Sequence, residues 1–373
     1  MDVSAAYRDW LILLYAPGLG PRTYQEILST HASPGRFLAA GPSAWQRTGL
    51  DAAACAALAH PDATRLARDL EWLSGPDNHL ITLLDPRYPR LLREISDPPP
   101  LLFVHGNPGL LAEPQLAIVG SRNPSADGEQ NAREFSRHLA AAGLAITSGL
   151  ALGIDAAAHR GALDVAGSTL AVTGTGLDRV YPASHRDLAH AIAEGGALVS
   201  EFPPGTPPLP ENFPRRNRLI SGLSLGVLVV EAALRSGSLI TARLAAEQGR
   251  EVFAIPGSIH NPLARGCHAV IRQGAKLVET AQDIIEELGP LAGVTLATPP
   301  AGESVTDPAE LDADYRQLLD QLGHGPLAVD QLVDRSGLTA EAVSSMLLIM
   351  ELQGLVASVP GGRYVRASIR GQQ

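Results

Sequence analysis

Three arginines lie close together near the middle of the chain. Arg215, Arg216 and Arg218 fall within residues 213–218, a segment that contains no acidic residue and also holds Asn217. A guanidinium group is planar and donates paired hydrogen bonds, which suits phosphate oxygens. Phe213 begins the segment, and its ring is either a platform for a nucleobase or an ordinary core side chain. The segment predicts a ligand that carries phosphate.

A second anion-binding feature follows the arginines. Gly222 is expected to act as a conformational breaker that ends the preceding element. Residues 227–230 follow, and their apolar run indicates a buried strand. Ser236, Gly237 and Ser238 then open a predicted helix. Free N–H groups and the helix dipole favour anions at such a start, and Ser238 is expected either to cap the helix or to donate to the ligand.

Two further glycine turns follow predicted strands. Gly120, Ser121 and Arg122 come after residues 116–119, where Gly120 lets the backbone approach a ligand. The alternative is a tight turn with a solvated arginine.

The other glycine turn lies between residues 144–147 and a helix. It contains Ser148, Gly149 and Gly153, and these glycines suit a loop that faces phosphate. Asp155 is expected to cap the helix. His159 is expected to be a packed histidine, because no nucleophile is paired with it.

Composition and spacing exclude several classes of protein. Lys276 is the sole lysine and is not in a P-loop, while Cys55 and Cys267 have no metal-binding or disulfide spacing. The GxSxG match at 222–226 lies before a strand, whereas a nucleophile elbow follows one. Arg179 stands where a dinucleotide fingerprint needs its third glycine. We therefore expect no cofactor, no metal and no catalytic residue.

The remaining bulk features concern partners and compartment. The net charge of −10 argues against general affinity for nucleic acid but allows a local basic patch. The apolar run at 10–15 is too short to span a membrane and has no signal-peptide pattern. A cytoplasmic protein is expected.

Short apolar runs that alternate with helical stretches must position these residues. Such runs indicate strands of a parallel sheet covered on both faces. We predict an α/β fold with an extended Rossmann-like, doubly wound sheet, and ligands at the carboxyl ends of its strands. The runs are residues 116–119, 144–147, 169–172, 197–200, 227–230, 251–255 and 275–278.

Four segments organise the chain. Residues 1–75 are expected to form a helical domain of helix-hairpin-helix or SAM-like type, and residues 76–288 the Rossmann-like domain that contains the expected phosphate-binding segments. Residues 289–308 are rich in Pro, Gly and Ala and indicate a linker. Residues 309–373 predict a winged helix. Its recognition helix, 339–353, contains two glutamates and no lysine or arginine, which favours a protein contact or weak DNA binding over sequence-specific binding.

Taken together, the central motifs resemble the DprA/Smf family, the DNA-processing proteins of natural transformation. The matching stretches, in order, are VGSR, TSGLALGIDAAAHRGAL, TGTGLDRVYPASH, ALVSEFPPG, NFPRRNRLISGLSLGVLVVEA, SGSLITARLAAEQGREVFAIPG and GCHAVIRQGAKLV. They cover about residues 116–280, and the helical and winged-helix units also match the architecture of many members.

The resemblance implies a non-enzymatic protein that binds incoming single-stranded DNA, forms a homodimer, and helps to load RecA recombinase past SSB. The family's DNA contacts carry over to Ser121, Arg122, Ser148, Gly149, Phe213, Arg216, Asn217 and Arg218. Two departures remove positive charge from the expected groove. Leu152 stands where many members have arginine, and Pro210, Glu211 and Asn212 stand where many have a cation.

Two other functions remain open. A nucleotide phosphoribohydrolase-like enzyme would hold a phosphate at residues 236–238 and use Glu231 or Glu247 as its carboxylate, although the fuller glycine pattern of such enzymes is missing. A sequence-specific regulator would use the winged helix, which its acidic recognition helix disfavours.

Overall fold

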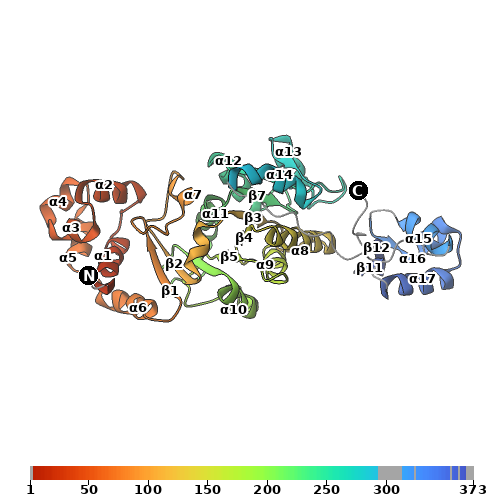
Figure 1. Ribbon diagram of the computed structural model, residues 1–373, viewed down its shortest axis with the longest axis horizontal. Coiled ribbons are helices and arrows are strands. Elements are labelled where there is room, and N and C mark those ends of the chain that lie inside the picture. Colours follow the sequence, from red (N-terminus) through yellow and green to blue (C-terminus); the bar gives the residue numbers. More distant parts are fainter. Residues whose placement is uncertain (1–2, 293–312, 323–324, 353–354, 360–361, 367–373) are drawn as a thin grey trace. The chain divides into compact units, whose positions relative to one another are not determined.

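A computed structural model describes residues 3–292, 313–322, 325–352, 355–359 and 362–366 (Figure 1). The chain divides into two compact units, residues 1–299 and 300–373. The linker predicted at 289–308 lies largely outside the described residues. Each unit is described by itself.

The first unit begins with a run of short helices. Several have recognisable starts: Pro21, Pro34 and Pro42 are first helical residues, where proline fits, and Asp51 caps the fifth helix by accepting from the amide of Ala54 at 2.8 Å. They are α1 (Val3–Tyr15), α2 (Pro21–His31), α3 (Pro34–Ala39), α4 (Pro42–Arg47), α5 (Ala52–Ala59) and α6 (Ala63–Leu73).

These helices share a core with the sheet that follows. The rings of Trp10 and Tyr24 stack at 6.1 Å inside the helical part, and Trp72 meets Phe103 of the sheet edge to face at 5.8 Å. One hydrophobic cluster runs through both parts. Because the helices and the sheet share this cluster and belong to one compact unit, the domain boundary expected at residue 75 stays a prediction.

One sheet contains nine strands of the described residues, in the order β1-β2-β6-β5-β4-β3-β7-β8-β9. From β6 to β9 all neighbours are parallel, whereas β1–β2 and β2–β6 are antiparallel. The strands are β1 (Asn78–Thr82), β2 (Leu101–Gly106), β3 (Gln115–Val119), β4 (Ala145–Ser148), β5 (Thr169–Val172), β6 (Ala197–Ser200), β7 (Gly226–Val229), β8 (Glu251–Ala254) and β9 (Lys276–Leu277). The predicted Rossmann-like fold class is confirmed.

Helices cover both faces of the sheet. They are α7 (Arg90–Arg93), α8 (Ala126–Ala141), α9 (Ile154–Leu163), α10 (Arg186–Gly195), α11 (Asn212–Leu223), α12 (Ser238–Glu247), α13 (Arg265–Arg272) and α14 (Ala281–Ala292), with short 3-10 turns η1 (Pro108–Ala112) and η2 (Ala183–His185). Side chains alternate across a strand, so Leu116 and Ile118 of β3 pack on the face of α8, α9 and α14. Ala117 and Val119 pack on the opposite face, in the cluster that includes α11 and α12.

The strand order creates a switch point between β3 and β7. These strands are neighbours, but the chain leaves β3 toward β4 on one side and leaves β7 toward β8 on the other. Loops that diverge in this way leave a crevice at the carboxyl ends of the two strands. Both the turn at Gly120 and the loop before α12 lie there.

The second unit is a small winged helix. α15 (Ala313–Leu322), α16 (Val329–Ser336) and α17 (Ala340–Leu352) surround a core with Leu318, Leu332 and Leu347. β10 (Leu327–Ala328), β11 (Val356–Val359) and β12 (Arg363–Arg366) form an antiparallel sheet. The predicted C-terminal winged helix is confirmed.

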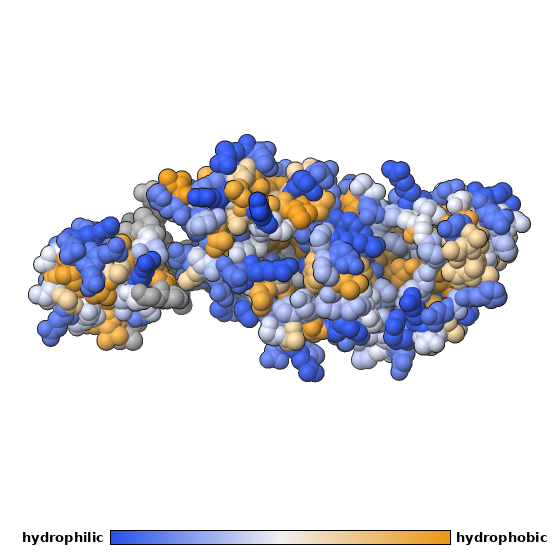
Figure 2. All heavy atoms as spheres, turned by 180° about the vertical axis from the view of Figure 1, so that it is seen from behind, coloured by the Kyte–Doolittle hydropathy of each residue, from blue (hydrophilic) through white to orange (hydrophobic). Residues whose placement is uncertain are grey.

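On the face seen in Figure 2, hydrophilic side chains predominate and apolar side chains form separate patches. Among the described residues, no helix combines the length and apolar character needed to cross a membrane.

Candidate functional site

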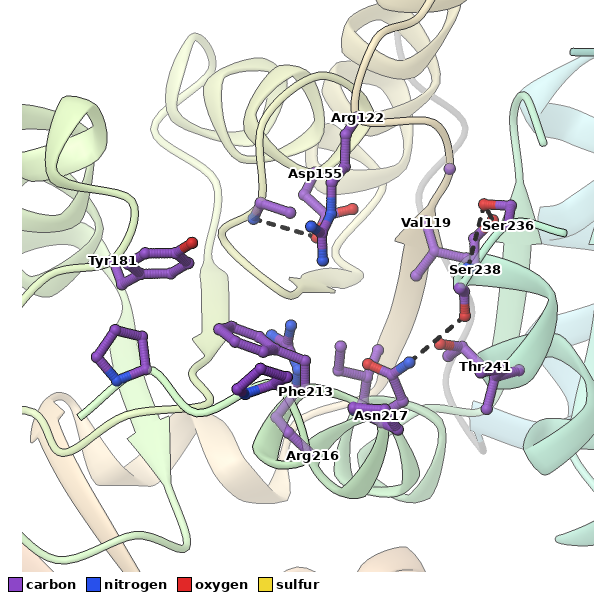
Figure 3. A pocket seen from close by; sticks show the side chains of 18 residues that line it. Val119, Arg122, Asp155, Tyr181, Phe213, Arg216, Asn217, Ser236, Ser238 and Thr241 are labelled. Atoms are coloured by element: carbon purple, nitrogen blue, oxygen red, sulfur yellow. Dashed lines mark hydrogen bonds between the residues drawn. The ribbon is translucent and has the colours of Figure 1, made fainter. Parts of the chain in front are cut away.

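A cavity of about 570 Å³ occupies the switch point (Figure 3). It lies where the loops after β3, β4, β5 and β7 meet the first turns of α11 and α12. The structure brings together eight residues that the sequence singled out: Gly120, Arg122, Phe213, Arg216, Asn217, Ser236, Gly237 and Ser238. We call this cavity the main cleft.

Arg122 supplies an exposed positive charge at the main cleft. Its guanidinium group points into the cavity in Figure 3, and we find no hydrogen bond or ion pair for it within the described residues. Gly120 allows this turn, because a Cβ there would lie 2.6 Å from Cγ1 of Ile154 and 2.9 Å from the carbonyl oxygen of Glu231. Ser121 shapes the turn, since its hydroxyl accepts from the amide of Asn123 at 3.1 Å.

Arg216 supplies a second positive charge, which is buried. Its Nη1 donates to the carbonyl of Gly149 at 2.7 Å and also to the carbonyl of Val172, while its Nε has no partner. Burial lowers the pKa of Arg216 to about 10, although nearby Asp155 opposes the shift. The group is still charged at neutral pH. A buried cation with an unsatisfied N–H is stabilised by an anion that enters beside it.

Asp155 holds the loop after β4 in place. Its Oδ2 accepts from the amides of Gly149 at 3.1 Å and Ala151 at 3.3 Å. Burial raises the pKa of Asp155, against the effect of Arg216 and of these amides. The amide of Gly149 therefore already donates a hydrogen bond within the protein.

Internal contacts also engage the other residues of that loop, whose expected ligand contacts stay a prediction. The Ser148 hydroxyl is buried and donates to the carbonyl of Ile118 at 2.6 Å. A Cβ on Gly149 would lie 2.4 Å from the Arg216 guanidinium, and one on Gly153, whose φ is +75°, would lie 2.4 Å from the carbonyl oxygen of Ser121. These three residues are closely packed and do not line the main cleft.

Arg215 and Arg218 point away from the main cleft. All three arginines lie on α11, where successive side chains are about 100° apart, so Arg216 projects differently from the other two. Arg218 forms a buried ion pair with Glu201 at 2.5 Å and a second pair with Asp97 at 3.1 Å. Arg215 pairs with the same Glu201 at 3.2 Å.

These pairs place the Arg218 guanidinium against two carboxylates while its Nη1 has no hydrogen-bond partner, so the expected contact of Arg218 with phosphate stays a prediction. Burial raises the pKa of Glu201, and Arg218 opposes that shift most strongly. Arg215 is still 60% exposed at its side chain, with its guanidinium 5.5 Å from the ring centre of Phe202. The sequence did not reveal Glu201 and Asp97 as partners of these arginines, because both acids lie far from them along the chain.

The start of α12 forms a polar wall of the main cleft. The hydroxyls of Ser236 and Ser238 lie 2.7 Å apart, and Asn217 donates to the carbonyl of Gly237 at 3.4 Å. Gly237 is exposed, and a Cβ there would meet nothing within 4 Å. The wall therefore offers hydroxyl groups and an accessible helix start to an anion.

Aromatic rings form the opposite wall. Tyr181 and Phe213 have their ring centres 5.5 Å apart with planes tilted by 44°, and Tyr181 is 47% exposed. Phe213 also packs on Gly174, where a Cβ would lie 3.0 Å from its Cδ1. Sequence reasoning missed Tyr181; its signal was an aromatic residue in the loop after a parallel strand, at the edge where ligands bind.

His159 is a packed core histidine, as predicted. It is fully buried, and its Nδ1 lies 2.7 Å from the hydroxyl of Thr169. Burial lowers its pKa to about 3, so it is neutral at physiological pH. It does not line the main cleft.

The carboxylates of the alternative enzyme are engaged elsewhere. Glu231 accepts from the hydroxyl of Ser125 at 2.6 Å and from its amide at 2.9 Å, which fixes the start of α8. Glu247 ends α12 and pairs with Arg243 at 3.5 Å. Neither lines the main cleft.

Comparisons with known proteins agree on one family. The family model described as DNA recombination-mediator protein A matches residues 79–289, and the DprA winged helix domain matches residues 302–362. Protein Smf of Escherichia coli (strain K12) is 49% identical over 298 residues, which is 79% of each chain. The DNA processing protein DprA of Streptococcus pneumoniae is 50% identical over 206 residues, 55% of this chain and 73% of that protein.

Solved structures extend the likeness. The X-ray structure of DprA from Streptococcus pneumoniae has a TM-score of 0.68 and 39% identity, and the match covers 75% of this chain and 97% of that chain. DprA from Helicobacter pylori, solved to describe a single-stranded DNA binding mode, has a TM-score of 0.52 and 31% identity. That match covers 57% of this chain and 96% of the other.

Proposed function

Because this chain belongs to the DNA recombination-mediator protein A family, we propose that it binds single-stranded DNA in the main cleft. One observation carries the proposal: unpaired Arg122 and under-satisfied Arg216 lie in the same cleft as the rings of Phe213 and Tyr181. Cations bind the phosphates while rings stack on bases, and the bases are free to stack when the DNA is single-stranded.

The two walls of the main cleft are assigned different roles. Arg122 and Arg216 bind phosphate, and Asn217, Ser236 and Ser238 add polar contacts from the start of α11 and α12. The rings on the other wall bind bases. The Helicobacter pylori relative supports this assignment, since its structure concerns single-stranded DNA binding.

The supporting residues have a different role. Gly120, Ser121, Ser148, Gly149 and Gly153 shape the two turns beneath the ligand, as their close contacts indicate. Arg218 holds α11 against Glu201. Arg215 is the exposed arginine of α11. Its attraction for phosphate is reduced, because it also pairs with the carboxylate of Glu201.

Substitution of Arg122 tests the proposal. Arg122→Ala should weaken binding to an oligothymidylate, and the slope of log affinity against log salt should fall by about 0.7, the value for one lost phosphate contact on a single strand. Fluorescence anisotropy titrations over a salt series, with single-stranded DNA, duplex DNA and free nucleotide as ligands, measure both quantities. Wild-type protein should prefer the single strand.

Arg160→Ala is the matched control, because Arg160 is an exposed arginine on α9 that does not line the main cleft. Equal affinity and equal slope for both variants would refute the assignment. Release of a base from a nucleotide such as AMP would instead support the enzymatic alternative.

We also propose that the bound strand is handed to RecA recombinase in the presence of SSB, by a homodimer of this protein. The family description as a recombination mediator supports this role. The rate of RecA filament assembly on SSB-coated DNA should rise with wild-type protein and rise less with Arg122→Ala. Light scattering gives the oligomeric state. A monomer, or stimulation that Arg122→Ala leaves unchanged, would contradict this part of the proposal.

A further inference from the structure

A second cavity, of about 370 Å³, runs along one side of α10. It is separated from the main cleft by one loop. Val180 of that loop lines the second cavity, and the next residue, Tyr181, lines the main cleft. The two cavities are therefore lined by consecutive residues of one loop.

The groove is lined by α10, β6, β2 and the loop after β5, with both apolar and charged side chains. Arg186, His190 and Ala193 of α10 line it, at the i, i+4 and i+7 spacing that places side chains on one helix face. Leu198 of β6 and His105 of β2 line it from the sheet. The apolar members of this lining, such as Ala193 and Leu198, suit the faces of nucleobases.

The charge of the groove favours an anion. Arg186 is exposed, and we find no hydrogen bond or ion pair for it within the described part of the chain. The carboxylate that lines the groove, Asp178, is already neutralised, since it pairs with Arg179 at 2.8 Å and accepts from the amide of Gly205 at 2.7 Å. Arg186 is thus an unpaired cation among the residues that line the groove.

We propose that this groove holds the continuation of the single strand bound in the main cleft, with Arg186 on a phosphate and the apolar lining against a base. The inference rests on the proposed function, and continuity with the main cleft identifies the occupant as nucleic acid rather than peptide. Tyr181 then stands where the strand passes from one site to the other.

Affinity measured against DNA length tests the groove. Oligothymidylates from about 4 to about 20 nucleotides span the lengths that single-strand sites of this kind cover. Arg186→Ala should match wild type on the shortest strands. On strands long enough to pass Tyr181 it should bind about three- to tenfold more weakly. On those longer strands its salt slope should be smaller by about 0.7.

Ala193→Gln provides a second test without a change of charge, because it fills the groove with a polar side chain. It should cause the same length-dependent loss, while Arg160→Ala, on α9, should cause none. If Arg186→Ala and Ala193→Gln both follow wild type at every length while Arg122→Ala weakens binding, the groove inference is overturned by itself. If Arg122→Ala also binds like wild type, the assignment of the main cleft as the DNA-binding site is refuted as well.

Discussion

Arg216 keeps its charge inside the fold because two carbonyl oxygens and a nearby carboxylate replace part of its hydration. The carbonyls belong to the loop after β4 and to β5, so the guanidinium also ties together two strand ends. Its Nε remains without a partner. A phosphate in the main cleft would supply the missing acceptor, which is why this side chain serves both the fold and the ligand.

Arg218 differs from Arg122 in what its removal should change. Arg218→Ala leaves the buried Glu201 with one partner, Arg215, and breaking a buried pair in this way costs about 3 kcal/mol of unfolding free energy. The salt slope of DNA binding should stay the same, because Arg218 pairs with two carboxylates and does not line the main cleft. Arg122→Ala should show the reverse: a smaller slope with nearly unchanged stability. Urea unfolding and salt titrations separate the two effects.

Glu201→Gln combined with Arg218→Ala is the control for this prediction. It removes the buried charge that the single substitution leaves behind, so part of the stability should return. A reduced salt slope in Arg218→Ala, with unaltered stability, would restore Arg218 to the phosphate site.

At the level of elements, α11 determines where the arginines point. It starts at Asn212 with Pro214 in its first turn, where proline is tolerated, and it continues to Leu223. The prediction that Gly222 ends the preceding segment as a conformational breaker was wrong. Gly222 is helical, and its missing side chain leaves room for Leu92 and Ile95, from which a Cβ would lie 2.9 Å and 3.1 Å away. The sequence alone does not distinguish a glycine that is needed for close packing from one that is needed for a turn.

Substitution of Gly222 tests this packing role. Gly222→Val should gain a few tenths of a kcal/mol of helix preference but lose about 1–3 kcal/mol through overpacking against buried Leu92. Gly195→Val is the matched control, because Gly195 is also helical and exposed, and a Cβ there would lie at an ordinary contact distance of 3.4 Å from Cδ2 of Leu163. Denaturation midpoints should fall for the first and stay nearly constant for the second. Equal midpoints would mean that the contact is relieved at little cost.

The strands were predictable and the site only in part, for a physical reason. Buried parallel strands are continuous apolar runs, so β5 and β6 have their predicted bounds. The glycine turns follow from the same pattern. Pairing between Glu201 and Arg218, or the approach of Tyr181 to Phe213, depends on how distant segments meet, and no local pattern encodes it.

For the whole molecule, the proposed DNA-binding cleft and the winged helix belong to different units. The main cleft is built entirely from residues of the first unit, and that unit has its own hydrophobic clusters. The net charge of −10 means that affinity for a polyanion must come from local cations such as Arg122. The recognition helix α17 adds none, since its sequence holds two glutamates and no lysine or arginine.

Deletion of residues 309–373 tests that separation. Single-stranded DNA affinity should stay within about threefold of the full-length value, because no phosphate-binding cation of the main cleft is lost. α17 instead exposes Leu348 at 58% and Ile349 at 38%, and Glu351 is occupied by the amide of Ser358 at 3.1 Å, a surface that suits a protein better than a phosphate backbone. Arg122→Ala in the truncated protein should weaken binding as it does in the full chain. A near-total loss of affinity on deletion alone would show that the winged helix contributes directly to DNA binding.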